Sequence, residues 1–160
     1  MSDILLYTDG STIKKPQSDG TILGKGPGGW GVVLLWENHN YRKEFSGGES
    51  CTTNNRMELT AVIEGLKRIK KRDITVHIYS DSQYVVDAIE KGWLTKWVLK
   101  NFKDKKNEDL WREYLAVAKD FTNLKFHWVK GHADNKENNR CDELAQQQAT
   151  LFSKQIRVDY

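Results

Sequence analysis

Four acidic residues, each beside an apolar run, are the first candidates for chemistry in this chain: Asp9, Glu58, Asp81 and Asp142. They are too far apart in sequence for a local motif such as an EF-hand loop, so only the fold can gather them. Gathered, they offer hard oxygen ligands, which suit Mg²⁺ or Mn²⁺ better than zinc. Two such ions, about 3.5–4 Å apart, would activate a water molecule and stabilise the leaving oxygen in phosphodiester cleavage.

Three of these residues also have a purely structural explanation. Asp9 precedes Gly10, a pair typical of turns. Asp81 precedes a predicted helix, where aspartate is a common N-cap. Glu58 lies near another predicted helix start, where the helix dipole favours a carboxylate. However, Asp9 and Asp81 both end apolar strands, and on neighbouring strands their like charges would cost stability. A metal ion would remove that cost.

The elements that position these residues follow from hydrophobic periodicity. Residues 4–8 form a run that is long enough for a buried strand and too short for most helices. Residues 13–29 are rich in glycine and predict a long loop or a stretched hairpin connection. Further strands are predicted at 30–36, 41–45, 74–79 and 124–129, and helices after 53–55, after 82, across 109–118 and from 141 to 152. Residues 153–160 show no periodicity and are expected to form a tail. This order predicts an α/β fold, a mixed sheet covered by helices.

Positive charge is concentrated in one segment. Residues 91–106 contain six lysines and one aspartate, a net +5, so the rest of the chain sums to −2 against a total of +3. Trp93, Trp97 and Phe102 alternate there with Lys96, Lys100 and Lys103. One interpretation is an amphipathic helix that packs its aromatic residues on the core. The other is a nucleic-acid surface, because stacking and phosphate neutralisation act together.

Two polar clusters are further candidates. Thr53, Asn54 and Asn55 are more donors and acceptors than one helix cap requires, and they suit phosphate oxygens or sugar hydroxyls. His132 follows Gly131 in a predicted loop, where an ordinary exposed histidine is the simpler interpretation.

Length and composition narrow the class of protein. A chain of 160 residues with a mean hydropathy of −0.69 fits one domain, and its 11% aromatic content argues against disorder. There is no apolar run of membrane-spanning length and no signal peptide, so we expect a soluble cytoplasmic protein without a membrane partner. Cys51 and Cys141 show no metal-ligand spacing and are expected to be free thiols.

Four segments, in order along nearly the whole chain, together resemble bacterial ribonuclease HI. They are residues 7–11 (YTDGS), 52–59 (TTNNRMEL), 79–85 (YSDSQYV), and the pair 128–132 (WVKGH) with 138–145 (NNRCDELA). Any one of them alone is a weak signal, whereas the four in this order are specific.

The resemblance implies a five-stranded mixed sheet in a single catalytic domain over residues 1–160. It implies hydrolysis of the RNA strand of an RNA–DNA hybrid, leaving 3′-hydroxyl and 5′-phosphate ends. By the same resemblance, Asp9, Glu58, Asp81 and Asp142 ligate two Mg²⁺ ions, with Mn²⁺ a possible substitute. His132 corresponds to a loop histidine that assists proton transfer or product departure, and we expect a monomer.

The resemblance also implies a set of substrate contacts. Asn54, Asn55 and Gln83, with Thr53 beside them, match residues that contact the hybrid in its minor groove, where the 2′-hydroxyl identifies RNA. Trp93 and Trp97 match the aromatic part of a basic protrusion that grips the DNA strand, and Lys96, Lys100 and Lys103 supply its charge.

Two stretches depart from the family pattern. The segment 13–29 is longer than the usual turn, so no substrate contact is assigned to it. The protrusion after Trp97 is short, and Val98-Leu99 replaces a basic run, which bears on affinity for the hybrid.

Two other functions are compatible with such a chain. A catalytically silent hybrid- or duplex-binding module would lack a metal ligand, and all four are present. A different nuclease of the same fold, such as a transposase or junction-cleaving domain, would not need residues that read the 2′-hydroxyl or the lysine-tryptophan segment.

Overall fold

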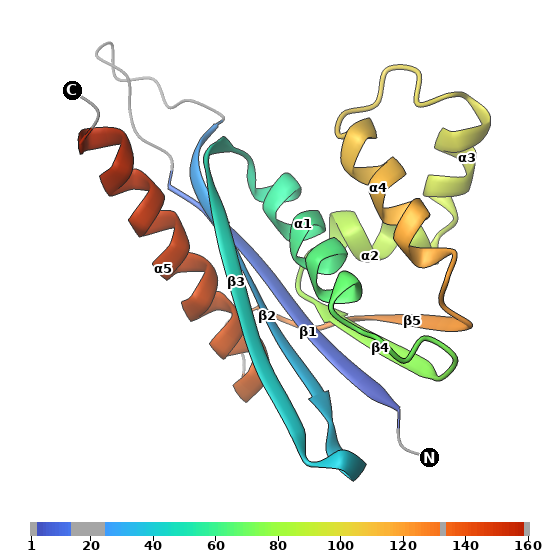
Figure 1. The fold of residues 1–160 in the computed structure, drawn as a ribbon. Coiled ribbons are helices and arrows are strands. Elements are labelled where there is room, and N and C mark those ends of the chain that lie inside the picture. The colour runs from blue at the N-terminus through green and yellow to red at the C-terminus, as the bar shows by residue number, and fades with distance from the viewer. Residues whose placement is uncertain (1–2, 14–24, 132–133, 159–160) are drawn as a thin grey trace.

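Five strands form one mixed sheet in a computed structural model that describes residues 3–13, 25–131 and 134–158 (Figure 1). The sheet order is β3-β2-β1-β4-β5. Strands β1, β2 and β3 pair antiparallel, whereas β4 pairs parallel with both β1 and β5. The strands are β1 (Ile4–Thr12), β2 (Gly26–Trp36), β3 (Tyr41–Thr52), β4 (Thr75–Ser80) and β5 (Asn123–Trp128). The predicted five-stranded mixed sheet is therefore confirmed.

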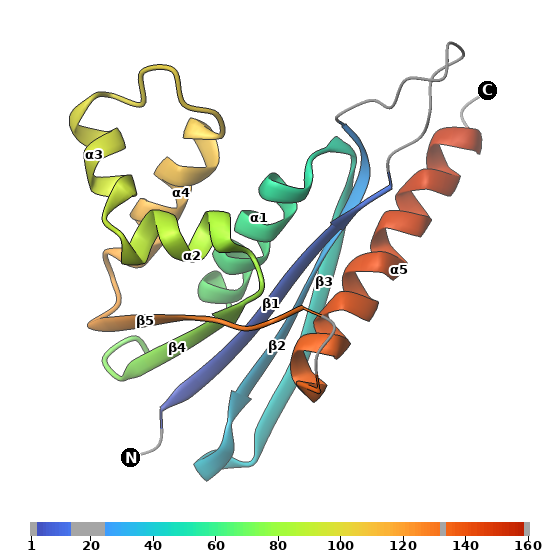
Figure 2. The same cartoon turned by 180° about the vertical axis from the view of Figure 1, so that it is seen from behind.

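Helices cover both faces of this sheet. They are α1 (Asn54–Lys67), α2 (Gln83–Glu90), α3 (Trp93–Leu99), α4 (Glu108–Ala118) and α5 (Lys136–Val158). Helices α1 and α2 pack on one face and α4 packs on α1, while α5 crosses β1, β2 and β3 on the other face (Figures 1 and 2). None of the helices within the described ranges is long and apolar enough to cross a membrane.

Strand β2 shows why the sheet needs both layers. Its residues from Pro27 to Leu34 are all buried, as expected for a strand covered on both sides. Val32 and Leu34 belong to the main core beneath α1, whereas Val33 packs with Cys141 and Leu144 of α5. Cys51 is exposed and Cys141 is buried, and both are free thiols as predicted.

Several predicted boundaries are wrong. Strand β2 begins at Gly26 rather than 30, and β3 continues to Thr52 rather than ending at 45. The glycine signal failed because antiparallel pairing uses backbone groups alone, and Gly28 and Gly29 still pair with β1 and β3. The expected tail after 152 belongs to α5, which runs to Val158. Of the predicted loop, residues 14–24 lie outside the described residues.

Two glycines of β2 let α5 lie directly on the sheet. A Cβ atom at Gly31 would overlap the carbonyl oxygen of Cys141, and one at Gly29 would overlap that of Ala145. Both obstacles are backbone atoms, so they cannot turn aside as a side chain would. The distance between α5 and the sheet, and therefore the position of Asp142, depends on these two glycines.

Substituting Gly31 with alanine should force α5 away from the sheet. We expect Gly31→Ala to lower the free energy of unfolding by about 1–3 kcal/mol, as overpacking of a filled interior does. Urea melts measure this. Lys43→Ala, on the exposed part of β3, is the control and should change stability by less than about 0.5 kcal/mol. A Gly31→Ala protein as stable as the parent would contradict the close packing.

Candidate active site

The register of β1 and β4 aligns two of the acidic residues. The parallel pairing ends at Tyr7 opposite Tyr79, and Asp9 and Asp81 each lie two residues further on. Contrary to the prediction, β1 does not end at Asp9 but continues to Thr12 along β2, because its pairing with β2 persists after its pairing with β4 stops. Asp9 therefore belongs to a strand, and the alternative explanation, a turn with Gly10, does not hold.

Glu58 reaches the same place from α1 because of Gly10. A Cβ atom at Gly10 would lie 2.5 Å from the backbone nitrogen of Glu58, so only glycine lets the first turns of α1 lie against β1. The amide of Gly10 donates to Glu58 Oε1 at 3.1 Å and to Asp9 Oδ1 at 2.9 Å. One backbone donor thus serves both carboxyl groups.

The three carboxyl groups form a compact cluster. Asp9, Glu58 and Asp81 each place an oxygen within 4.8 Å of the others. Asp9 is 3% exposed and Glu58 is 8% exposed, so two acidic side chains lie inside the protein next to a third. Burial and mutual repulsion are the conditions under which a carboxyl group holds its proton above the usual pH.

The pKa values follow from this placement. Burial, together with the charges of Asp81 and Asp142, raises the pKa of Asp9 from 3.8 to about 8, although hydrogen bonds from Glu58 and Gly10 oppose the change. Burial, then the charge of Asp9, raises the pKa of Glu58 well above its usual value. At neutral pH the metal-free pair therefore holds protons that ordinary carboxyl groups would have lost.

These residues fit a divalent cation. All the donors are carboxylate oxygens, the ligands that Mg²⁺ and Mn²⁺ prefer. In the part of the chain that the structure describes, Glu58 Oε2 is buried and accepts no hydrogen bond. An unsatisfied buried oxygen is costly, and a cation in contact with it would remove that cost.

Comparison with known proteins decides the family. The model of the RNase H family matches residues 1–150. The chain belongs to the ribonuclease H family. A ribonuclease H of Desulforamulus reducens is 48% identical over 150 residues, which cover 91% of this chain and 86% of that protein. Together with the acidic cluster, this makes the chain a metal-dependent ribonuclease, a hydrolase.

Solved structures of ribonuclease H proteins resemble the fold. The structure of LC9-RNase H1, a type 1 RNase H with the type 2 active-site motif, is 29% identical with a TM-score of 0.78, covering 92% of this chain and 72% of that one. The structure of LC11-RNase H1 in complex with an RNA/DNA hybrid is 25% identical with a TM-score of 0.63, covering 93% and 98%.

Asp142 of this ribonuclease H lies outside the cluster of three. It lies on α5, accepts a hydrogen bond from Gln146 at 3.0 Å, and is near enough for its charge to raise the pKa of Asp9. Two arginine–glutamate pairs fix the start of α5 to β3. Arg42 donates to Glu137 at 2.9 and 3.1 Å, and Arg140 donates to Glu44 at 2.9 and 3.0 Å.

The structural explanations considered for two acidic residues do not hold. The N-cap of α2 is Ser82, whose hydroxyl accepts from the amide of Val85 at 3.2 Å, so Asp81 does not cap that helix. Glu58 is the fifth residue of α1, and the hydrogen bond that it accepts from Gly10 comes from β1. Neither carboxylate is needed to start a helix.

The residues predicted to contact the minor groove lie at the starts of α1 and α2. Thr53 is the N-cap of α1, accepting from the amide of Arg56 at 3.3 Å. Asn54 accepts from the hydroxyl of Thr12 at 2.6 Å, while Asn55 and Gln83 are exposed at the starts of α1 and α2. Asn54 and Asn55 lie at the start of α1, the helix that carries Glu58, and Gln83 lies two residues after Asp81.

Some residues of the basic segment pack on the core, whereas others are exposed, so each of the two interpretations fits part of the segment. Phe102 is buried in the core, and the partly buried Trp97 packs against that core, edge-on to Trp111 with ring centroids 5.8 Å apart. Trp93 is 38% exposed, with the amine of Lys91 over its ring. Lys96, Lys100 and Lys103 are exposed.

Sequence reasoning missed two neighbours of Asp81. The indole of Trp128 donates to the backbone oxygen of Asp81 at 3.1 Å, and a Cβ atom at Gly131 would lie 2.8 Å from its Oδ2. The motif at 128–132 is the one sequence signal that pointed to Trp128 and Gly131, because hydrophobic periodicity assigns them no role. His132 lies outside the described residues, so its predicted role is not tested.

Burial of these charges predicts how stability changes with pH. The folded protein binds a proton at Asp9 up to about pH 8, whereas the unfolded chain releases it near 3.8. The free energy of unfolding of the metal-free protein should therefore fall as pH rises from about 4 to about 8. In EDTA at pH 7, Asp9→Asn should be more stable than the parent by roughly 0.5–2 kcal/mol, and less so at pH 5.

Denaturant melts in EDTA and in excess Mg²⁺ measure this difference. Added Mg²⁺ should narrow it, because the ion stabilises the parent more than the variant. Asp104→Asn, at an exposed position, is the matched control and should behave like the parent. An Asp9→Asn protein that is less stable than the parent in EDTA would show that the bond from Gly10 outweighs repulsion.

Proposed function

We propose that this protein hydrolyses the RNA strand of RNA–DNA hybrids with two Mg²⁺ ions and leaves 3′-hydroxyl and 5′-phosphate ends. The observation that carries the proposal is the buried cluster of Asp9, Glu58 and Asp81 in a chain of the ribonuclease H family. A solved relative that is 25% identical binds an RNA/DNA hybrid, which supports the choice of substrate.

The proposed roles follow from position. Asp9, Glu58 and Asp81 would hold the cations, and Asp142 would complete the set from α5. Bound divalent cations supply Lewis-acid chemistry, activating a water nucleophile and stabilising the leaving oxygen. The chain's own contribution is to hold deprotonated carboxylates in fixed places and to exclude bulk water from Asp9 and Glu58.

The remaining residues would select and orient the hybrid. Asn54, Asn55 and Gln83, with Thr53, would contact the minor groove, where the RNA 2′-hydroxyls lie. Trp93, Lys96, Lys100 and Lys103 would contact the DNA strand, with Trp97 supporting them from the core. His132 would assist proton transfer or product departure. In this proposal residues 1–160 act as a single catalytic domain and as a monomer.

Family membership and the intact cluster argue against the two other functions. A silent binding module would have no reason to keep three carboxylates at a destabilising distance. A different nuclease of the same fold would not need the exposed amides at the starts of α1 and α2. Labelled hybrid, duplex DNA, duplex RNA and single strands, each incubated with the protein and Mg²⁺, test the proposal, which expects cleavage of the hybrid's RNA strand alone.

Removing one ligand should separate binding from cleavage. Asp81→Asn keeps the side chain's shape but removes its charge, so hybrid cleavage should fall by on the order of 10²–10³-fold. Hybrid binding, measured in Ca²⁺ or without metal, should persist. Asp104→Asn is the control and should cleave normally. Near-normal turnover by Asp81→Asn would exclude Asp81 as a ligand.

The exposed lysines should determine how binding depends on salt. Replacing Lys96, Lys100 and Lys103 with alanine should raise KM and flatten the plot of log affinity against log salt. The slope should fall by about 0.9 per lost phosphate contact if the hybrid behaves like B-DNA. The control carries alanine at Lys43, Lys125 and Lys154, which are exposed elsewhere. An equal change in both triple variants would show that the total charge of the protein, and not the position of these lysines, sets the salt dependence of binding.

A further inference from the structure

A cavity of about 270 Å³ lies beyond the C-terminal end of α1, away from the acidic cluster. Its apolar lining comes from Ile4 and Leu34 of the sheet, from Ile69, and from the rings of Trp36 and Tyr41. Glu58 lies near the start of α1 and the cavity lies past its end, so about 14 Å of helix separates them. The cavity is therefore not part of the proposed hybrid site.

The aromatic rings of Trp36 and Tyr41 line this cavity. The Trp36 ring lies against the ring of His39, with centroids 3.6 Å apart, so it is held from one side. Tyr41 is 37% exposed, and its ring is therefore available to a ligand. An apolar group that entered between such walls would be removed from water at little ordering cost to the protein.

The rim of the cavity carries a cation for which the described part of the chain shows no carboxylate partner. The run 67–72 contains five basic residues, and four of them contact a carboxylate. Lys70 contacts none among the described residues, although it lines the cavity together with Arg68 and Lys71. Arg68 and Lys71 are paired with Glu64 and Asp73 respectively. Lys70 is thus the cation that is available to an incoming anion.

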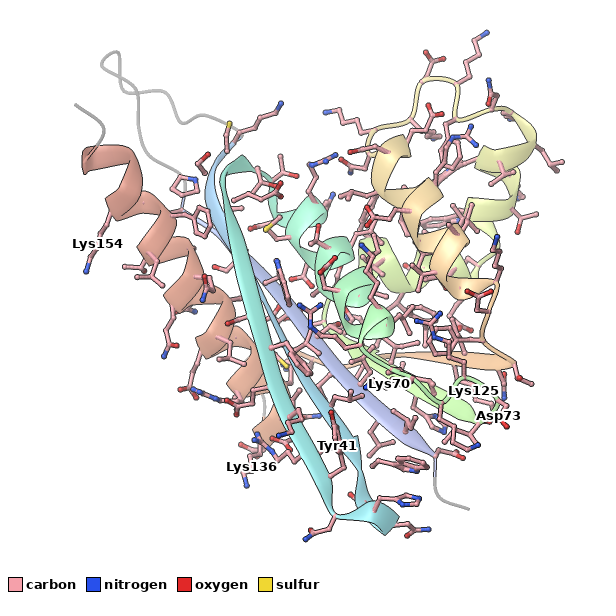
Figure 3. All side chains as sticks on the ribbon, in the orientation of Figure 1. Tyr41, Lys70, Asp73, Lys125, Lys136 and Lys154 are labelled. Carbon is pink, nitrogen blue, oxygen red and sulfur yellow. The ribbon has the colours of Figure 1, made fainter. Side chains whose placement is uncertain are left out.

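We propose that this cavity binds a compact amphipathic monocarboxylate, with its aromatic or branched apolar group between Trp36 and Tyr41 and its carboxylate at Lys70. The volume suits a small ligand rather than a long chain. The apolar lining disfavours a phosphodiester backbone, which carries no apolar group of this kind next to its charge. An uncharged ligand would gain no ionic contact with Lys70. Figure 3 shows Tyr41 and Lys70 toward the same end of the molecule, and Lys154 well away from them on α5.

The test is calorimetry or NMR titration of the full chain, in Mg²⁺, with indole-3-acetate and with indole-3-acetamide. The acetate should bind at a single saturable site, and the uncharged amide at least about tenfold more weakly, since a hydrogen bond to a charged group is lost. Lys70→Gln should abolish this preference, and Tyr41→Ala should weaken both ligands. Lys154→Gln is the matched control and should bind as the parent does.

Four results would overturn the proposal. One is no saturable binding of the acetate up to about 10 mM. Another is equal binding of acetate and amide to the parent, and the third is an unchanged preference in Lys70→Gln. Binding of an acidic peptide, but of no free carboxylate, would also reject it. Hybrid cleavage by Lys70→Gln should equal that of the parent, so this proposal and the proposed function can fail independently.

Discussion

Asp9 and Glu58 share one backbone donor, the amide of Gly10, and both lie buried beside Asp81. This concentration of acidic groups is unfavourable by itself, because burial and repulsion both oppose ionisation. The surrounding elements must hold it in place: β1 and β4 by their register, and α1 by its contact with Gly10. The core beneath α1 supplies the stability that the site lacks, as is common where function requires strain.

Helix α5 is held by a different set of contacts. Gly29 and Gly31 let it approach the sheet, and two bidentate arginine–glutamate pairs join its first turns to β3. These pairs are partly exposed, so they contribute more to position than to stability. Asp142 follows Arg140 by two residues, and therefore its distance from Asp9 depends on contacts made with β2 and β3.

How much could be read from the sequence differs between the fold and the site. The strands were predictable because apolar runs of strand length are local signals, and the five-stranded mixed sheet followed from the resemblance that the four motifs carry. The extension of β2 back to Gly26 was not, since it depends on pairing with distant strands. The roles of Gly10 and Gly31 were equally hidden: a glycine's close contact is visible only when the opposing backbone is known.

A divalent cation should replace protons at Asp9 and Glu58, and calorimetry tests this exchange directly. Mg²⁺ or Mn²⁺ is titrated into the metal-free protein at pH 7 in buffers of different ionisation enthalpy, which gives the number of protons released. Since burial raises the pKa of Asp9 to about 8, binding should release protons at pH 7 and fewer as pH rises past that value. Binding at pH 7 without proton release, or equal binding by Asp9→Asn, would contradict the account.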